Sequence, residues 1–91
     1  MKYQVKFTKR FQRERKLMKK RGMKMDLLQH VIDLLREGSP LPMHYQDHPL
    51  TGDYKGFREC HIKPDWLLIY LIEKNVLVLT LMRTGTHSDL F

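Results

Sequence analysis

Thiol chemistry and long apolar runs are both scarce in this sequence. A single cysteine, Cys60, cannot form an internal disulfide, so a reducing cytoplasm is the expected compartment. The longest apolar stretches, 66–72 and 76–82, are far too short to cross a bilayer. Lysines and arginines interrupt every apolar run near the N-terminus, so we expect no secretory signal.

Acidic residues are nearly missing from the first part of the chain. Residues 1–24 hold eleven Lys and Arg but one acid, Glu14, which gives a net charge of +10. Residues 25–91 hold six Lys and Arg and nine acids, a net charge of −3. A basic block of this kind attracts a phosphate backbone or an acidic protein, although a solvated helix face is the simpler alternative. The charge alone does not distinguish DNA, RNA, ribosome and acidic protein.

The length and composition are those of one ordinary globular domain. The 91 residues are 42% hydrophobic and 30% charged, which excludes a disordered tail. We therefore expect a single domain over residues 1–91, with one modest core.

The N-terminal part is predicted to form a strand and two helices. Alternating apolar residues at 3, 5 and 7 are typical of a half-buried strand. Thr8 can cap a helix that ends near Arg21, before Gly22. A second helix over 25–37 follows from the spacing of its leucines, and Gly38 ends it. Their short connection predicts an antiparallel helical hairpin.

The C-terminal part reads as three antiparallel strands after an irregular stretch. Residues 38–53 contain three of the four prolines, and a loop of this length is usually functional or mobile. Strands are then expected over 54–62, 66–73 and 76–83. The order β-α-α-β-β-β predicts an α+β fold in which an antiparallel sheet packs against the helical hairpin.

The strand register predicts a functional site at one end of this sheet. If Lys74 and Asn75 form a two-residue hairpin loop, Trp66 lies opposite Arg83. The preceding turn brings His61 and Asp65 to the same end, with His87 and Phe91 close by. A turn longer by one residue would move every side chain to the other face.

These residue types are the ones that phosphodiester cleavage without a metal requires. Imidazole can take and give a proton near neutral pH. A guanidinium can stabilise charge on the phosphoryl oxygens, and RNA supplies its own nucleophile, the 2′-OH. Trp66 and Phe91 can stack bases of single-stranded RNA.

Each residue also has a simpler interpretation. His61 can be a half-exposed sheet residue, Arg83 can pair with Glu59 or Asp65, and the two aromatic residues can belong to the core. His44 and His48 lack a helical scaffold and a paired cysteine, so we expect no metal site and no cofactor. Cys60 is expected to be a small buried hydrophobic residue. The convergence of these residues favours a site.

The motifs of residues 41–91 closely resemble the YafQ branch of the RelE/ParE toxin superfamily. The resemblance is carried by YQDHPLTG from Tyr45, GFRECHIKPDWLLIY from Gly56 and RTGTHSDLF from Arg83. It implies a RelE-like fold and a bacterial toxin of a type II toxin–antitoxin pair. Such toxins enter the ribosomal A site of the 70S ribosome and cut mRNA there without a metal ion, and a co-encoded, DinJ-like antitoxin neutralises them.

The resemblance also implies roles for individual residues. His48 and Asp65 are the candidates for activating the 2′-OH, and His61 for positioning the phosphate. His87 would protonate the 5′ oxygen and Arg83 would stabilise the transition state. Trp66 and Phe91 would hold bases. The basic helix would bind ribosomal RNA through Lys9, Arg10, Arg13, Lys16, Lys19 and Lys20.

Two rival functions stay open at this point. A ParE-like member of the same superfamily would inhibit DNA gyrase by binding, without chemistry. A basic nucleic-acid-binding module would have no toxin role. Both leave the histidines without a purpose, so we expect a ribosome-dependent endoribonuclease.

Overall fold

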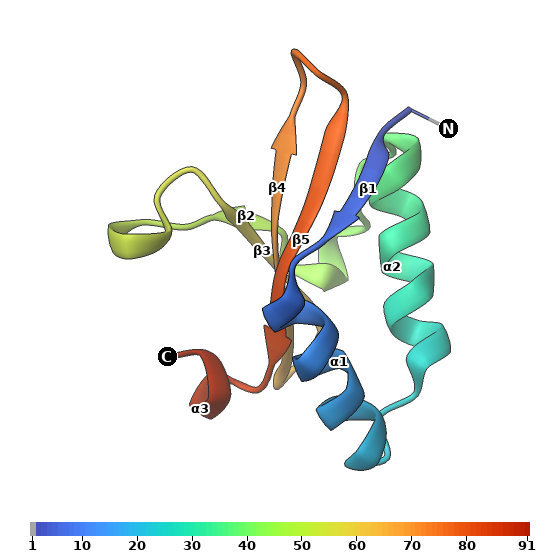
Figure 1. Cartoon of the computed structure of the whole chain (residues 1–91), viewed down its shortest axis with the longest axis vertical. Helices are drawn as coiled ribbons and strands as arrows, with labels where there is room; N and C mark the ends of the chain where they lie inside the picture. Colours follow the sequence, from blue (N-terminus) through green and yellow to red (C-terminus); the bar gives the residue numbers. More distant parts are fainter. Residues whose placement is uncertain (1) are drawn as a thin grey trace.

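A five-stranded sheet with two long helices, α1 and α2, over one of its faces forms the molecule (Figure 1). The computed structural model describes residues 2–91; Met1, the first residue of the expected domain, lies outside that range. No helix within residues 2–91 is long and apolar enough to span a membrane. The elements are β1 (Gln4–Phe7), α1 (Lys9–Lys20), α2 (Met25–Glu37), the 3-10 helix η1 (Met43–Tyr45), β2 (His48–Pro49), the 3-10 helix η2 (Gly52–Tyr54), β3 (Arg58–Lys63), β4 (Trp66–Glu73), β5 (Val78–Gly85) and α3 (His87–Leu90).

The predicted strand and both predicted helices are confirmed. Thr8 is the N-cap of α1, and its hydroxyl accepts a hydrogen bond from the backbone N–H of Phe11. Gly38 ends α2 in the left-handed conformation, with φ of 76°, a backbone geometry that favours glycine. Figure 1 shows the two helices running in opposite directions, as a hairpin requires.

The sheet is mixed, whereas a purely antiparallel sheet was predicted. The strand order is β1-β5-β4-β3-β2, and β1 pairs with β5 in parallel while the other pairs are antiparallel. The parallel direction of β1 follows from the position of α1, the next element along the chain. The hydroxyl of Thr8 donates to the carbonyl of Met82, which fixes the start of α1 beside the far end of β5.

The first predicted strand of the meander begins later than expected. Residues 54–57 were assigned to it, but η2 and Gly56, with φ of 97°, turn the chain there. The strand β3 therefore starts at Arg58, and the segment around η2 projects from the sheet (Figure 1).

The predicted register of the β4–β5 hairpin is wrong. Glu73 pairs with Val78, so the turn contains residues 74–77 and Leu77 adopts a positive φ of 55°. A β-bulge follows, because Tyr70 pairs with Leu81 while Ile69 pairs with Arg83. Arg83 therefore lies opposite Ile69 and not opposite Trp66. The longer turn and the bulge cannot be seen in the alternation of apolar residues.

The bulge also determines which face Arg83 occupies. Leu81 belongs to the core on the helix-covered face, and strict alternation would place Arg83 there as well. The extra residue, Met82, packs with Leu67 and Ile69 on the other face, and Arg83 follows it there. This second face, on the side of the sheet away from α2, is called the open face below.

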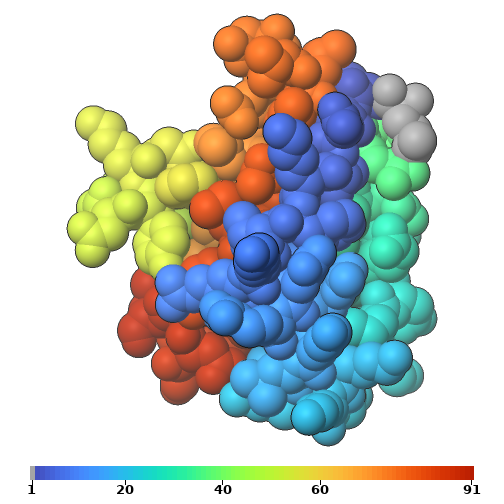
Figure 2. Space-filling model, viewed as in Figure 1, coloured from blue at the N-terminus to red at the C-terminus, as the bar shows by residue number. Residues whose placement is uncertain are grey.

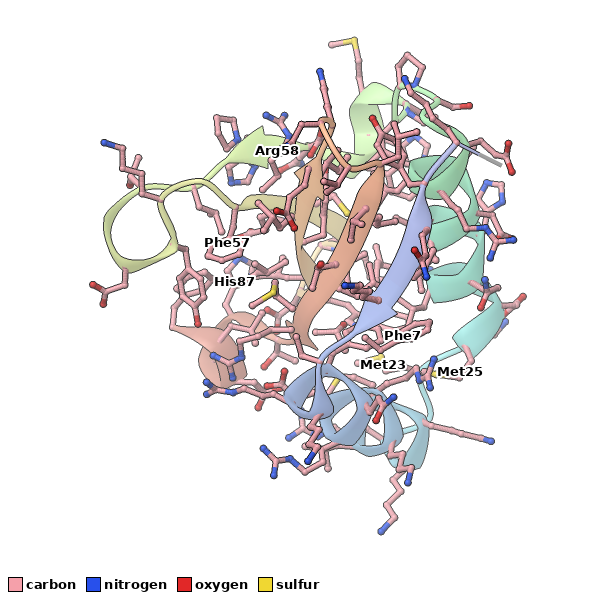
Figure 3. All side chains as sticks on the ribbon, turned by 45° about the horizontal axis from the view of Figure 1, so that its top comes forward. Phe7, Met23, Met25, Phe57, Arg58 and His87 are labelled. Atoms are coloured by element: carbon pink, nitrogen blue, oxygen red, sulfur yellow. The ribbon has the colours of Figure 1, made fainter. Side chains whose placement is uncertain are left out.

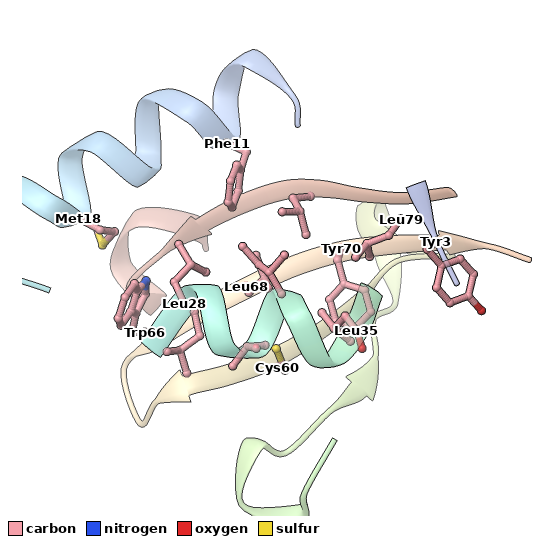
Figure 4. Close-up of a cluster of buried hydrophobic side chains, with 14 residues drawn as sticks. Tyr3, Phe11, Met18, Leu28, Leu35, Cys60, Trp66, Leu68, Tyr70 and Leu79 are labelled. Atoms are coloured by element: carbon pink, nitrogen blue, oxygen red, sulfur yellow. The ribbon is translucent and has the colours of Figure 1, made fainter. Parts of the chain in front are cut away.

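Trp66 belongs to the core of the helix-covered face, which corrects its predicted role in base stacking. Its ring is 1% exposed, and Figure 4 shows it at one end of the apolar cluster beside Met18 and Leu28. Its indole N–H donates to the Thr84 hydroxyl at 3.0 Å, and that hydroxyl donates to the Leu67 carbonyl at 2.8 Å. A base has no free ring surface to stack on, so Trp66 fixes β4 to the end of β5.

Candidate active site

His87 is placed on the open face by the short helix α3. Thr86 and Asp89 form a capping box: the Thr86 hydroxyl accepts from the Asp89 backbone N–H, and the Asp89 carboxylate accepts from the Thr86 backbone N–H. Figure 3 shows His87 on the same side of the sheet as Phe57, away from α2. The cap fixes α3 directly after β5, so His87 follows the strand end without a flexible linker.

Asp65 holds His87 through two hydrogen bonds. Its Oδ1 accepts from the His87 backbone N–H at 2.9 Å and from ring Nδ1 at 2.6 Å. The backbone bond, and then the ring bond, lower the pKa of the Asp65 carboxyl below its usual value. The proton on Nδ1 leaves Nε2 as the ring atom available to a substrate.

His61 and Glu59 lie beside this pair on β3. The ring of His61 is 5.6 Å from that of His87, measured between centroids. Its Nδ1 is 3.3 Å from the Pro64 carbonyl, and its Nε2 is 3.5 Å from the Glu59 carboxylate. Glu59 was missed as a site residue, although strand alternation from His61 places both on one face.

His48 completes the row of histidines. Its ring lies 6.1 Å from that of His61, because β2 pairs with β3 and His48 lies opposite Glu59. Nδ1 is 2.7 Å from the Gln46 carbonyl, which can only accept, so Nδ1 carries a proton and Nε2 is free. His48, His61, Asp65 and His87 are thus brought together, as predicted.

Asp47 anchors the segment that carries His48. It accepts hydrogen bonds from the Arg58 guanidinium, at 3.0 and 3.3 Å, and from the Tyr70 hydroxyl. Burial and the neighbouring Asp47 carboxylate raise the pKa of the Tyr70 hydroxyl, which therefore stays a donor. The irregular stretch before β3 is consequently fixed to the sheet at this point.

Arg83 lies on the open face, but within residues 2–91 it forms no hydrogen bond or ion pair with His48, His61, Asp65 or His87. It forms an ion pair with Glu14 of α1 at 2.6 Å, and it also donates to the Tyr54 hydroxyl and to the Asp89 carbonyl. The hydrogen bond to Glu14, and then the one to Tyr54, raise the pKa of Arg83. The simpler alternative, in which Arg83 pairs with Glu59 or Asp65, is not observed within residues 2–91. The strand β4 lies between β5, which carries Arg83, and β3, which carries Glu59.

Phe91 is the aromatic residue that remains available to a base. Its side chain is 64% exposed and lies edge-on against Tyr54, with ring centroids 5.9 Å apart. Tyr54 also accepts from Arg83, so the exposed aromatic ring and the guanidinium share Tyr54 as a partner. Tyr54 was not predicted, and only the tertiary structure brings it here.

The basic residues of α1 are exposed to solvent, as the predicted ribosome contact requires. Lys9, Arg10, Arg13, Lys16, Lys19 and Lys20 are all exposed. The molecular surface places α1 beside the C-terminal helix α3 (Figure 2). Arg21, at the end of α1, joins the two helices through an ion pair with Asp89 at 2.7 Å.

Two further residues of the sequence analysis can now be placed. Cys60 is fully buried, as expected, and this burial raises the pKa of its thiol, which makes it a poor nucleophile. His44 is exposed and packs on Tyr45, outside the histidine row.

Glu59, His61 and His87 form a group that fits a transition-metal ion. Each offers one ligand atom, and these atoms lie within 4.8 Å of one another. Two imidazoles and a carboxylate are a donor set that zinc and copper accept. No metal site was predicted from the sequence, and the histidines weighed for one, His44 and His48, are not members of this group.

Comparisons with known proteins identify the family to which the chain is similar. The profile of a family described as "Bacterial toxin of type II toxin-antitoxin system, YafQ" matches residues 3–91. The mRNA interferase toxin YafQ of Escherichia coli (strain K12) is 40% identical over 88 residues, which is 96% of this chain and 94% of that protein.

Solved structures of similar toxins have the same fold. The E. coli DinJ–YafQ complex matches with a TM-score of 0.89 at 39% identity, covering 98% of each chain. A metal-bound toxin from Helicobacter pylori matches with a TM-score of 0.92 at 44% identity, covering 98% of this chain and 99% of that one. This chain belongs to the YafQ family of toxins of bacterial type II toxin–antitoxin systems.

Proposed function

We propose that this protein is an endoribonuclease that cuts mRNA in the A site of the ribosome. The observation that carries the proposal is the Asp65–His87 pair, a hydrogen-bonded carboxylate and imidazole, on a face that also holds His61 and His48. Such a pair can hold a proton ready for a leaving group. The cleavage activity named for the E. coli relative supports the same conclusion.

In the proposed reaction the phosphoryl group is transferred from the 5′ oxygen of the next nucleotide to the neighbouring 2′ oxygen. His48 Nε2 takes the 2′-OH proton, the 2′ oxygen attacks phosphorus, and the bond from phosphorus to the 5′ oxygen breaks. His87 Nε2 gives its proton to that 5′ oxygen. The products are a 2′,3′-cyclic phosphate and a 5′-OH. The pKa of the Asp65 carboxyl is lowered, so its carboxylate is a weak base. We therefore assign to Asp65 the orientation of His87 and not the removal of the 2′-OH proton.

The remaining residues of the open face hold the substrate. His61 lies between His48 and His87 and positions the phosphate. Arg83 stabilises the charge that develops on the phosphoryl oxygens, and Phe91 stacks on a base. This chemistry is complete without a metal ion, so the proposal is a metal-independent reaction.

The basic residues of α1 give the enzyme its ribosome dependence. Their exposed charges bind ribosomal RNA and bring the open face to the mRNA. The site of action is then the cytoplasm, where mRNA is translated.

The second partner is a cognate antitoxin. The E. coli relative has been solved in a DinJ–YafQ complex, which supports a co-encoded, DinJ-like antitoxin for this chain. Purification of the protein from its native host is expected to bring down a small co-encoded protein. Recovery of the toxin without one would count against this partner.

A gyrase-binding toxin of the ParE type is not favoured. Inhibition by binding requires no acid–base pair, and the Asp65–His87 pair would then have no purpose.

The test is His87→Gln, assayed on a programmed ribosome with mapping of the mRNA ends and free RNA as a control. Loss of the general acid is expected to lower the cleavage rate by about 10²–10⁴, while the fold and ribosome binding persist. His30→Gln, the same change at an exposed position of α2, should cleave at the wild-type rate. If His87→Gln cleaves as fast as the wild type, the acid assignment is wrong.

Chelation tests whether cleavage needs a metal ion at Glu59, His61 and His87. Cleavage is expected to survive EDTA, because imidazoles carry both proton transfers. Loss of cleavage in EDTA, restored by zinc or copper, would replace the metal-independent reaction.

A further inference from the structure

The guanidinium of Arg83 is held almost completely by other groups of the protein. Its Nε lies 3.2 and 3.3 Å from the two carboxylate oxygens of Glu14, and its Nη2 lies 2.6 Å from one of them. Nη2 also donates to the Asp89 carbonyl at 3.3 Å. The side chains of Arg83 and Glu14 are 9% and 16% exposed, so water weakens this pair little.

One edge of the same guanidinium remains partly free. Nη1 donates to the Tyr54 hydroxyl at 3.0 Å and has a second N–H. Tyr54 packs against the exposed ring of Phe91. Tyr54 therefore contacts both Arg83 and the aromatic ring that we assign to a base, so we expect a phosphate of the same RNA strand to pass near the second N–H of Nη1.

Glu14 is an exception within its own helix. It is the one acid among residues 1–24, and it is turned toward the sheet while six of the seven basic residues of α1, all except Arg15, are exposed. Its Oε1 also accepts from the Thr84 backbone N–H at 3.3 Å, which ties the carboxylate to the strand that carries Arg83.

We infer that Glu14 is a positioning residue for RNA cleavage, which acts by holding the Nε–Nη2 edge of Arg83 so that Nη1 faces the phosphate. Glu14 does not touch the substrate. The inference rests on the proposed role of Arg83 at the phosphate. A bidentate carboxylate fixes a guanidinium in direction as well as in place, which a single hydrogen bond does not.

A purely structural tie between α1 and β5 is the alternative. Loss of Glu14 leaves a buried cation without its partner, so a lower melting temperature is expected under either reading. Stability alone therefore does not test the inference. Single-turnover cleavage must be measured well below the melting temperature of every variant, with its rate constant separated from KM for programmed ribosomes.

The decisive measurement is a double-mutant cycle of Glu14→Gln and Arg83→Gln. Glu14→Gln is expected to lower the cleavage rate constant by about 10- to 100-fold with little change in KM, since a small misplacement of a catalytic group has effects of this size. Glu14→Asp should recover part of the rate. Glu37→Gln, the same change at an exposed position of α2, is the matched control and should behave as the wild type.

The double variant separates the two readings. If Glu14 acts through Arg83, the double variant cleaves as slowly as Arg83→Gln and no slower. A further loss in the double variant, or unchanged or faster cleavage by Glu14→Gln, would overturn the inference and leave the role of Arg83 standing. Wild-type cleavage by Arg83→Gln would overturn both, while the His87→Gln result would still test the reaction itself.

Discussion

Two carboxylates of the C-terminal segment have lowered pKa values for different reasons. Asp65 is held mainly by the backbone N–H of His87, and Asp89 mainly by the guanidinium of Arg21 and then by the Thr86 backbone. The first bond orients a proposed catalytic ring. The second fastens α3 to α1. At the scale of single residues, two ionised carboxylates therefore hold α3 in place, one through His87 and one through Arg21.

Asp89 gives a stability prediction at acid pH. Its pKa is lowered from 3.8 to about 2, so the folded state favours the ionised carboxylate. The resulting stability is fully present above about pH 4 and is lost as the pH falls from about 4 to about 2. Urea unfolding of wild type and Asp89→Asn over this range should give curves that converge at low pH.

The control is Asp53→Asn, the same change at an exposed residue without an ion pair within residues 2–91. Its unfolding free energy should follow that of the wild type. A constant difference between wild type and Asp89→Asn down to pH 2 would contradict the assignment.

At the scale of secondary-structure elements, α1 fixes the C-terminal half of the chain. It is attached to the C-terminal half at three points along its length: Thr8 to Met82, Glu14 to Arg83, and Arg21 to Asp89. The helix proposed to bind ribosomal RNA is thus the same helix that holds Arg83 and α3. Loss of its N-terminal cap should therefore lower the free energy of unfolding of the whole domain.

Thr8→Ala is expected to lower the free energy of unfolding by about 1 kcal/mol, because the backbone N–H of Phe11 loses its acceptor and the Met82 carbonyl loses its donor. Thr8→Ser keeps the hydroxyl and should lose much less. Urea titration monitored by circular dichroism measures both. Equal stabilities of the alanine and serine variants would show that the hydroxyl does not cap α1.

At the scale of the whole molecule, the basic helix α1 and the helix that carries the proposed general acid lie on adjoining surfaces. The helix α1, which carries six exposed lysines and arginines, lies beside α3, which carries His87 (Figure 2). Ribosome binding should therefore be strongly salt-dependent, since each phosphate contact releases a counterion.

Replacement of Lys16 and Lys20 by glutamine tests this arrangement. The slope of log Kd for ribosomes against log salt should fall by about one for each lysine that contacts a phosphate. Co-sedimentation at several salt concentrations measures the slope. Lys74→Gln, in the turn between β4 and β5, is the matched control, and an identical slope for all variants would exclude α1 as the contact.

The sequence by itself determined the local elements of this protein. The cap at Thr8, the leucine spacing of α2 and the stop at Gly38 depend on neighbours a few residues away, so they can be read directly. His61 and His87 were grouped by the short turns between the elements that carry them, and their rings do lie close together. His48 was included only because the motifs of residues 41–91 resemble the YafQ family, and its ring lies beside that of His61.

The tertiary structure alone decided where Arg83 and Trp66 lie. Because of a four-residue turn and a bulge, Arg83 lies opposite Ile69 on the open face. Trp66 is buried in the core. The parallel pairing of β1 and the partnership of Glu14 with Arg83 also join residues far apart in the chain. Such contacts depend on how the whole chain closes, because hairpin turns and bulges set the register and local sequence patterns leave them open.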